Sequence, residues 1–460
     1  MKIFVECTNL YEQPIHQSGI PRVVRNIVGS LSKIGDLADA MPVIIRKDKV
    51  YEIKKMPVIK GGHYFFSLLQ TRFIQIKNRS YWFRLRLNHY WPFRKSVRLR
   101  RALFFFSRMV DGFLGLPVTL AFGIRRLFDP EPHLVELAAE SGDVLILLDA
   151  TWIADLYQTI EKLKSKGVII VAVVYDLIPL THPQFFKERL VDLFNNWLVW
   201  VIQTADGFMA ISKTILYQLE HTVVKSVQKN SLSQQWYDYF YLGTELDLAK
   251  KFGSIESNVK APFHEGFPVY LVVSTIEPRK NHHYLLDAFE LLWNAGFNLI
   301  LLIAGKVGWK CEGIMKRIQN HSEINRRLFM FNNLDDTELE YCYHNSRCLL
   351  SPSYLEGFGL PIVEAMQRGL PVMGSDISVF HEVGGDFMAY FDPKKPETLA
   401  ALVRRFEESN KFPALKELSQ WSWLTWEDSA RQLVSKVLSR VQLLRVEPEA
   451  IPDFNMTKVK

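Results

Sequence analysis

The chain has 460 residues, of which 48% are hydrophobic and 23% charged. This length exceeds what one hydrophobic core supports, and this balance excludes a disordered chain, so we expect two or three globular domains. The net charge of +7 is local, because residues 46–101 hold 16 Lys and Arg against two acids. The remainder of the chain sums to −7, so the basicity describes one surface and not the whole fold.

In the first half, short β-branched runs alternate with amphipathic stretches, which indicates βα units around a parallel sheet. Pro21 sits where a first helical residue belongs, with a fixed φ angle and no NH to leave unpaired. The predicted strands are residues 2–6, 40–46, 143–148, 168–174 and 207–211. The predicted helices are residues 21–34, 152–166, 185–204 and 213–227.

Residues 47–140 interrupt this rhythm and predict an insertion in the first domain. Ten Lys and Arg and no acid lie among bulky apolar side chains in residues 72–101, and an apolar run follows at 102–124. That run contains Arg108, Asp111 and Pro117, which argues against a membrane span. Two interpretations stay open: residues 72–124 contact a membrane interface, or they fold onto the first domain with their charges solvated.

A second alternating series begins near residue 268. Its predicted strands are residues 268–275, 298–305, 327–332, 347–353, 371–375 and 388–391, and its predicted helices are 281–294, 312–320, 336–344, 361–368 and 396–409. We therefore expect a first domain at 1–250, a linker at 251–266 and a second domain at 267–424. A closing helix at 425–445 is expected to cross back to the first domain, ahead of a tail at 446–460.

The strongest motif is Ser351–Met366, a buried strand that ends in a glycine-bearing turn and enters a helix at Pro361. Glycines allow close backbone approach, and the helix start directs NH groups and a positive dipole at the same crevice. Ligands of open α/β sheets bind at such strand ends. Glu356 and Glu364 bracket this crevice, where their oxygens can accept hydrogen bonds from sugar or ribose hydroxyls.

A second motif, Ser274–Asn281, places two adjacent cations after another buried strand. A diphosphate leaving group gains charge as a glycosidic bond breaks, and Arg279 and Lys280 could neutralise it. No Asp-x-Asp triplet lies near a strand end, which fits neutralisation by side chains and helix NH groups rather than by a metal ion. We therefore expect neither a metal nor a cofactor.

On these motifs the C-terminal half resembles the family 4 glycosyltransferases of the GT-B fold, in the branch of bacterial polysaccharide mannosyltransferases. The matching residues are Glu277–Asn281 and the pair Glu356 and Glu364, at the family's E-x7-E spacing. The resemblance implies an α/β fold of two Rossmann-like domains that face each other across a cleft. It also implies retention of the anomeric configuration.

The resemblance implies roles for individual residues. Arg279 and Lys280 would bind the donor diphosphate, Glu356 the transferred sugar and Glu364 the nucleotide ribose. The turn residues that would line the donor pocket are Gly357, Phe358, Gly359 and Leu360. The stretch Asn333-Leu334 is similar in position to the family's base-binding segment.

The first half shows a looser resemblance at two places. The run His16–Arg22 is similar to the family's N-terminal glycine loop, where Gly19 would approach the donor phosphates; a plain tight turn explains Gly19 equally well. Tyr175 and Asp176 correspond to the family's His-Asp pair. Tyr175 could hydrogen-bond the sugar, and Asp176 could act in catalysis or cap a turn.

The expected function is transfer of a hexose to a lipid-linked or polysaccharide acceptor in the synthesis of a cell-surface glycan such as O-antigen. The favoured donor is GDP-mannose, which would transfer mannose, and UDP-sugars stay open as an alternative. A dinucleotide oxidoreductase is disfavoured because the first strand lacks a G-x-G-x-x-G turn. A catalytically inactive sugar-nucleotide-binding protein stays open. A nucleic-acid-binding protein using residues 72–101 is the other alternative, although we expect no nucleic-acid partner.

The expected location is the cytoplasm, with contact at the inner face of the membrane if residues 72–124 bind lipid. We expect no secretory signal at the start of the chain, because Glu6 breaks its apolar run almost at once. Cys7, Cys311, Cys342 and Cys348 lack metal-ligand spacing, so we expect reduced thiols.

Overall fold

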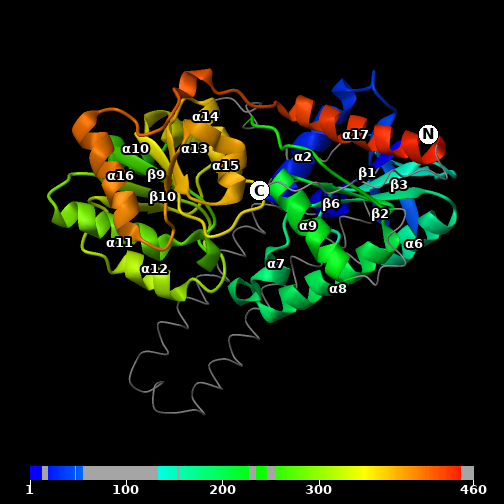
Figure 1. The fold of residues 1–460 in the computed structure, drawn as a ribbon, viewed down its shortest axis with the longest axis horizontal. Coiled ribbons are helices and arrows are strands. Elements are labelled where there is room, and N and C mark those ends of the chain that lie inside the picture. Colours follow the sequence, from blue (N-terminus) through cyan, green and yellow to red (C-terminus); the bar gives the residue numbers. More distant parts are fainter. Residues whose placement is uncertain are drawn as a thin grey trace, which may run out of the picture.

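The computed structural model describes residues 1–12, 19–46, 48–54, 133–152, 156–226, 235–245, 255–264 and 266–446. The proposed membrane segment 72–124 and the tail after Val446 lie outside these ranges. Two α/β domains stand side by side, each a sheet with helices on its faces (Figure 1). This confirms the predicted fold class.

The N-terminal domain holds an eight-stranded sheet in the order β4-β3-β2-β1-β5-β6-β7-β8. Six of its strands run parallel: β1 (Ile3–Glu6), β2 (Ala40–Arg46), β5 (Val144–Leu147), β6 (Ile169–Val174), β7 (Gly207–Ala210) and β8 (Trp236–Tyr239). Its helices are α1 (Thr8–Glu12), α2 (Ile20–Ser30), η1 (Leu31–Lys33), α6 (Tyr157–Ser165), α7 (Ile178–Thr181), η2 (Pro183–Phe185), α8 (Glu188–Thr204) and α9 (Lys213–Ser226).

Two antiparallel strands correct the interpretation of residues 47–140 as wholly an insertion. Strands β3 (Lys49–Ile53) and β4 (Leu134–Leu137) extend the sheet beyond β2 and flank that segment. Strand β4 is the edge of the sheet, and its Val135 and Glu136 are exposed, whereas Val50 and Ile53 of β3 are buried. The predicted helix at 152–166 also begins later, at Tyr157.

The C-terminal domain holds a six-stranded parallel sheet in the order β11-β10-β9-β12-β13-β14. The strands are β9 (Val269–Val273), β10 (Ile300–Ala304), β11 (Leu328–Phe331), β12 (Cys348–Ser351), β13 (Val372–Ser375) and β14 (Ala389–Phe391). Its helices are α10 (Ser257–His264), η3 (Pro278–Lys280), α11 (His282–Asn294), α12 (Glu312–Gln319), α13 (Asp336–Asn345), α14 (Leu360–Gln367), α15 (Ser378–Gly384), η4 (Gly385–Phe387), α16 (Pro396–Ser409) and η5 (Leu418–Gln420). Helix α10 lies in the predicted linker, with Val259 and Pro262 buried.

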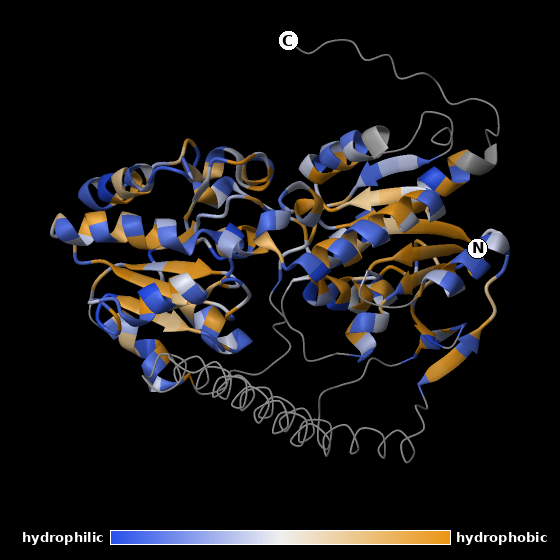
Figure 2. Cartoon of the chain, turned by 90° about the horizontal axis from the view of Figure 1, so that it is seen from below, coloured by the Kyte–Doolittle hydropathy of each residue, from blue (hydrophilic) through white to orange (hydrophobic). Residues whose placement is uncertain are grey.

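Burial in the two hydrophobic cores explains why the sequences of the central strands are continuous apolar runs. Helices cover both faces of each sheet, so β1, β5 and β10 are buried along their whole length. Figure 2 shows these strands in the hydrophobic colour, while the helices carry hydrophilic residues along their outer sides. All four cysteines are buried and unbridged. None of the helices in the described ranges has both the length and the hydropathy that a membrane crossing needs.

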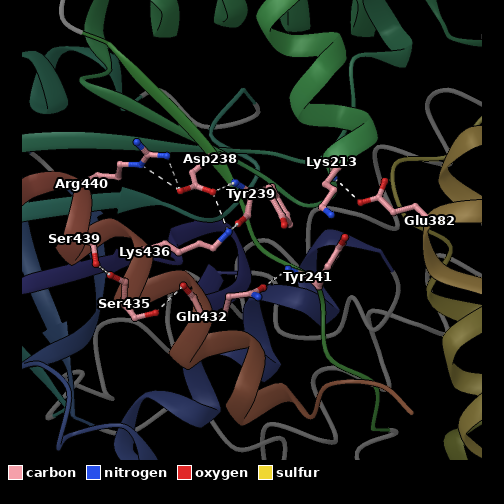
Figure 3. Close-up of polar contacts among 10 residues, drawn as sticks. All are labelled: Lys213, Asp238, Tyr239, Tyr241, Glu382, Gln432, Ser435, Lys436, Ser439 and Arg440. Carbon is pink, nitrogen blue, oxygen red and sulfur yellow. Dashed lines mark hydrogen bonds and ion pairs between the residues drawn. The ribbon is translucent and has the colours of Figure 1, made fainter. Parts of the chain in front are cut away.

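The last helix, α17 (Trp426–Val446), leaves the C-terminal domain and packs on α2 and β8 of the N-terminal domain (Figure 1). Asp238 of β8 anchors it by accepting hydrogen bonds from Lys436 Nζ at 2.9 Å and Arg440 Nη2 at 3.1 Å (Figure 3). Gln432 Oε1 accepts from the Tyr241 backbone NH at 2.6 Å. Both ends of the described chain therefore belong to the same domain.

Candidate functional site

The two sequence motifs end neighbouring strands. Strand β9 pairs with β12, and residues 274–281 and 353–356 leave these strands at the same edge of the sheet. The strand order reverses between β9 and β12, because β10 and β11 lie on one side and β13 and β14 on the other. Such a reversal opens a crevice at the carboxyl ends of the strands.

Arg279 and Lys280 converge on the carboxylate of Glu356. Arg279 Nη1 lies 2.8 Å from Glu356 Oε2, and Lys280 Nζ contacts Oε1. Ser353 Oγ donates to the same Oε1 at 2.7 Å. Glu277 Oε1 holds the other side of the guanidinium, 2.7 Å from Arg279 Nε. The predicted cations and the first predicted acid thus form one cluster, with all three side chains less than a fifth exposed.

Burial and pairing set the charge states of this cluster. Burial alone would raise the pKa of Glu356, but Lys280 and Arg279 hold it at about 2. Burial lowers the pKa of Lys280, and the neighbouring Arg279 adds to this effect. Burial raises the pKa of Glu277 against the attraction of Arg279. Glu356 is therefore a permanent carboxylate, while the two cations sit where an anion would be strongly bound.

Asp176 reaches this cluster from the N-terminal domain. It follows β6, and its Oδ1 accepts from the Ile178 NH at 3.0 Å, so it also caps the turn into α7. Burial raises the pKa of Asp176, and Arg279 opposes that shift. The domains touch here: a Cβ built on Gly357 would lie 2.2 Å from the Tyr175 carbonyl oxygen, and Ser212 Oγ donates to the Gly357 carbonyl at 3.0 Å.

Glu364 lies on α14 in a second, separate group. Its side chain is 1% exposed, and its Oε2 accepts from the Tyr343 hydroxyl at 2.8 Å. Its Oε1 lies 2.5 Å from Arg22 Nη1, which comes from α2 across the domain interface. The carboxylate of Glu364 is therefore fixed from both domains.

The turn between the two glutamates brings backbone, rather than side chains, to the crevice. Gly359 has φ 103°, a left-handed angle that favours glycine, and it provides no side-chain cap for α14. Pro361 has no NH and the Ile362 NH donates to the Gly359 carbonyl at 2.9 Å, so the first turn of α14 could offer an anion the Leu360 NH. Leu360 begins the helix half-buried. Phe358 instead packs into the core, with its ring centroid 5.9 Å from that of Trp423.

The other predicted residues occupy varied positions. Gly19 has φ 67° at the start of α2, and residues 13–18 before it lie outside the described ranges. Asn333 is exposed and Leu334 half-buried in the turn before α13, the helix that carries Tyr343. Tyr175 does not face the crevice: its hydroxyl donates to the Leu148 carbonyl at 2.7 Å inside the N-terminal domain. Burial raises its pKa well above the usual range.

Sequence reasoning did not single out Ser353, Glu277 or Arg22 as site residues. Ser353 and Glu277 lie inside the two motifs, and their positions three residues before Glu356 and two before Arg279 were a usable signal. Arg22 forms an ion pair with Glu364 of the other domain, and no local sequence pattern predicts a contact between domains. Its place directly after the Gly19 turn is the sole hint.

The C-terminal half of the chain matches a described family. Residues 254–420 match the family model described as Glycosyl transferases group 1. The chain is 32% identical over 305 residues to the serotype-specific mannosyltransferase WbdA of Escherichia coli, covering 64% of this chain and 37% of WbdA. It is 28% identical over 252 residues to the O-antigen chain mannosyltransferase RfbU of Salmonella typhimurium, covering 55% and 64%. The alignment thus spans little more than a third of WbdA.

Among solved structures, the sucrose-phosphate synthase of Thermosynechococcus elongatus superposes with a TM-score of 0.56 at 16% identity, covering 97% of this chain and 100% of that one. At this identity the likeness shows a shared fold, with two Rossmann-like sheets in the GT-B arrangement. The fold agrees with the family match of the C-terminal domain. Residues 254–420 thus form a domain of the group 1 glycosyltransferases, and the chain has the GT-B fold.

Proposed function

We propose that this chain is a retaining hexosyltransferase that moves mannose from GDP-mannose onto a glycan or lipid-linked acceptor during O-antigen synthesis. One observation carries the proposal: Arg279 and Lys280 leave one strand end, meet Glu356 from the next, and face Asp176 across the domain interface. Two buried cations beside two acids suit a sugar diphosphate, whose phosphates need positive charge and whose hydroxyls need acceptors.

In the proposed reaction the bond between the sugar C1 and the diphosphate oxygen breaks, and a bond from C1 to the acceptor oxygen forms on the same face. The acceptor's hydroxyl proton passes to the departing phosphate oxygen. Arg279 and Lys280 would neutralise the charge that grows on the diphosphate, and Glu356 would hold a hydroxyl of the transferred sugar. Glu277 and Ser353 would fix Arg279 and Glu356 in place beforehand, through contacts of 2.7 Å each.

The nucleotide would lie along α14 and α13. Glu364 would accept the ribose hydroxyls, while the turn Asn333-Leu334 would flank the base. Phosphates would sit near Gly359 at the start of α14 and near Gly19 at the start of α2, where the helix dipoles favour an anion. Both helices begin at a glycine with positive φ, so the backbone can approach the ligand without a Cβ in the way.

Mannose is favoured because the names of WbdA and RfbU both specify a mannosyltransferase. GDP is the nucleotide we propose, with UDP as the alternative. The acceptor would be a growing glycan chain at the membrane face, and residues 72–124 would supply the contact with lipid. Those residues lie outside the described ranges, so this part of the proposal rests on sequence.

A second candidate is a sugar-nucleotide-binding protein without transfer activity. Tyr175 favours it, because it replaces the family's histidine and turns its hydroxyl toward Leu148. The position that holds a histidine in the family therefore provides no titratable side chain to the proposed site in this chain. Transfer then depends on Asp176 and the cation cluster, and measurement of turnover separates the two candidates.

The proposal can be tested in two steps with the full-length protein. A thermal-shift screen over GDP-, UDP- and dTDP-sugars should show stabilisation with GDP-mannose, because a ligand of the folded state raises apparent stability by mass action. Transfer of radiolabelled mannose to a lipid-linked oligosaccharide should then be measured, with Glu356→Gln as the inactive variant. Stabilisation without transfer would favour the binding protein, and no shift with any sugar nucleotide would refute both.

A further inference from the structure

We propose that Arg22 is a positioning residue for the nucleotide ribose, which it controls through the carboxylate of Glu364 on the opposite domain. This inference rests on the proposed function, since it takes Glu364 as the acceptor of the ribose hydroxyls. It adds a residue of the N-terminal domain to the proposed ribose contacts, which otherwise come from α13 and α14 of the C-terminal domain.

The hydrogen-bonding capacity of the Glu364 carboxylate allows such a role. A carboxylate offers about four lone-pair sites. One oxygen of Glu364 accepts from Tyr343 at 2.8 Å, and the other contacts Arg22 at 2.5 Å. One site on each oxygen then remains, which matches the two adjacent hydroxyls of a ribose. Tyr343 and Arg22 together would set the rotation of the carboxylate plane.

The countercharge of Glu364 comes from the other domain. Its side chain is 1% exposed, and a buried carboxylate is costly unless it is paired. Arg368, the cation directly after the same helix, donates to the Glu364 carbonyl at 2.7 Å and lies 2.8 Å from Glu340, so it is committed elsewhere. The ribose acceptor is therefore complete only when α2 docks against α14.

Two consequences follow for binding. First, ribose recognition requires the docked arrangement of the domains, because separation would withdraw Arg22 and leave Glu364 without its ion-pair partner. Second, Arg22 should affect how well the protein distinguishes a ribose from a deoxyribose. A residue that only stabilised the fold would lower affinity for both nucleotides alike, or for neither.

The test compares dissociation constants for GDP and 2′-deoxy-GDP by titration calorimetry, or for UDP and 2′-deoxy-UDP if UDP-sugars give the thermal shift. The wild-type protein should prefer the ribonucleotide roughly tenfold or more, as expected for a lost hydrogen bond to a charged acceptor. Arg22→Met should reduce this preference to about twofold or less, and Arg22→Lys should restore part of it. Arg431→Met, which breaks an exposed pair with Asp36 at 2.8 Å, is the matched control and should keep the full preference.

A double-mutant cycle tests whether Arg22 acts through Glu364. In a Glu364→Gln background, Arg22→Met should change the preference little, because the shared carboxylate is already gone. Full preference in Arg22→Met would overturn the inference, and so would an equal loss of affinity for both nucleotides, which would place Arg22 on the phosphates. A wild-type preference near one would overturn it as well. Failure of the proposed function would appear separately, as absent sugar transfer by the wild-type protein.

Discussion

Both sheets reverse their strand order beside a central strand, and at each reversal acids lie at or after the two strand ends. In the N-terminal sheet they are Glu6, the last residue of β1, and Asp149 after β5; in the C-terminal sheet they are Glu277 after β9 and Glu356 after β12. The C-terminal pair is matched by Arg279 and Lys280, at contacts such as 2.8 Å between Arg279 and Glu356.

The N-terminal pair is held by backbone NH groups instead. Glu6 accepts from the Thr8 NH at 2.7 Å, and Asp149 from the Leu10 NH at 2.6 Å. Burial and the nearby Asp149 raise the pKa of Glu6 to about 7, whereas the pKa of Glu356 is held at about 2. Equivalent edges of the two sheets thus differ in chemistry. The C-terminal edge carries paired charges and suits an anionic ligand, whereas Glu6 at the N-terminal edge can hold a proton.

The largest expected effect comes from removing a cation at the C-terminal edge. Lys280→Met should lower the rate of sugar transfer by roughly 10² to 10³, because one preorganised group at the leaving diphosphate is lost. The measurement is kcat/KM for transfer from GDP-mannose. Lys416→Met, at an exposed pair with Asp386, is the control and should leave the rate unchanged. An equal rate in both variants would show that the C-terminal edge does not bind the diphosphate.

The contact between the two edges can be tested at Gly357. In Gly357→Ala the new Cβ would meet the Tyr175 carbonyl oxygen at 2.2 Å, and neither backbone can yield cheaply. The domains should separate slightly, and kcat should fall by about 10² from misplacement of the reacting groups. Gly29→Ala is the matched control, since nothing lies within 4 Å of its Cβ. An unchanged kcat together with an unchanged radius of gyration in X-ray scattering would argue against the need for this close contact.

The smallest expected effect concerns the pH dependence of stability at the N-terminal edge. The folded-state pKa of Glu6, about 7, lies above its ordinary value of 4.5, so the native state binds more protons than the unfolded one in this range. The free energy of unfolding should therefore fall as pH rises from about 4.5 to about 7. Urea unfolding at pH 5 and pH 8 measures this slope. Glu6→Gln should flatten it, and Glu408→Gln, an exposed acid on α16, should not.

The sequence predicted the βα alternation and the two motif strands well, because buried parallel strands are uniformly apolar and end in glycine or charged turns. It did not predict β3 or β4, because both are short and carry charged residues, Lys49 and Glu52 in β3 and Glu136 in β4. Strand β8 was also missed. Its Asp238 is stabilised by Lys436 and Arg440, about 200 residues away, so no local pattern marks it.

In the site, too, residues within local motifs could be predicted from the sequence, and long-range contacts could not. Arg279, Lys280 and Glu356 could be named because each follows a strand end within a short motif, and adjacent parallel strands bring such ends together. Two features needed the folded chain: the orientation of the Tyr175 hydroxyl toward Leu148 and the pairing of Arg22 with Glu364. Both depend on which side chains lie across an interface, and a single sequence does not encode that in its local spacing.

The return of α17 to the N-terminal domain means that the backbone passes between the domains twice, once between β8 and α10 and once between α16 and α17. Two covalent connections hold the domains together more tightly than one would, because each limits how far the domains can separate. Deleting α17 would leave a single tether, and we expect the effective concentration of one domain at the other to fall.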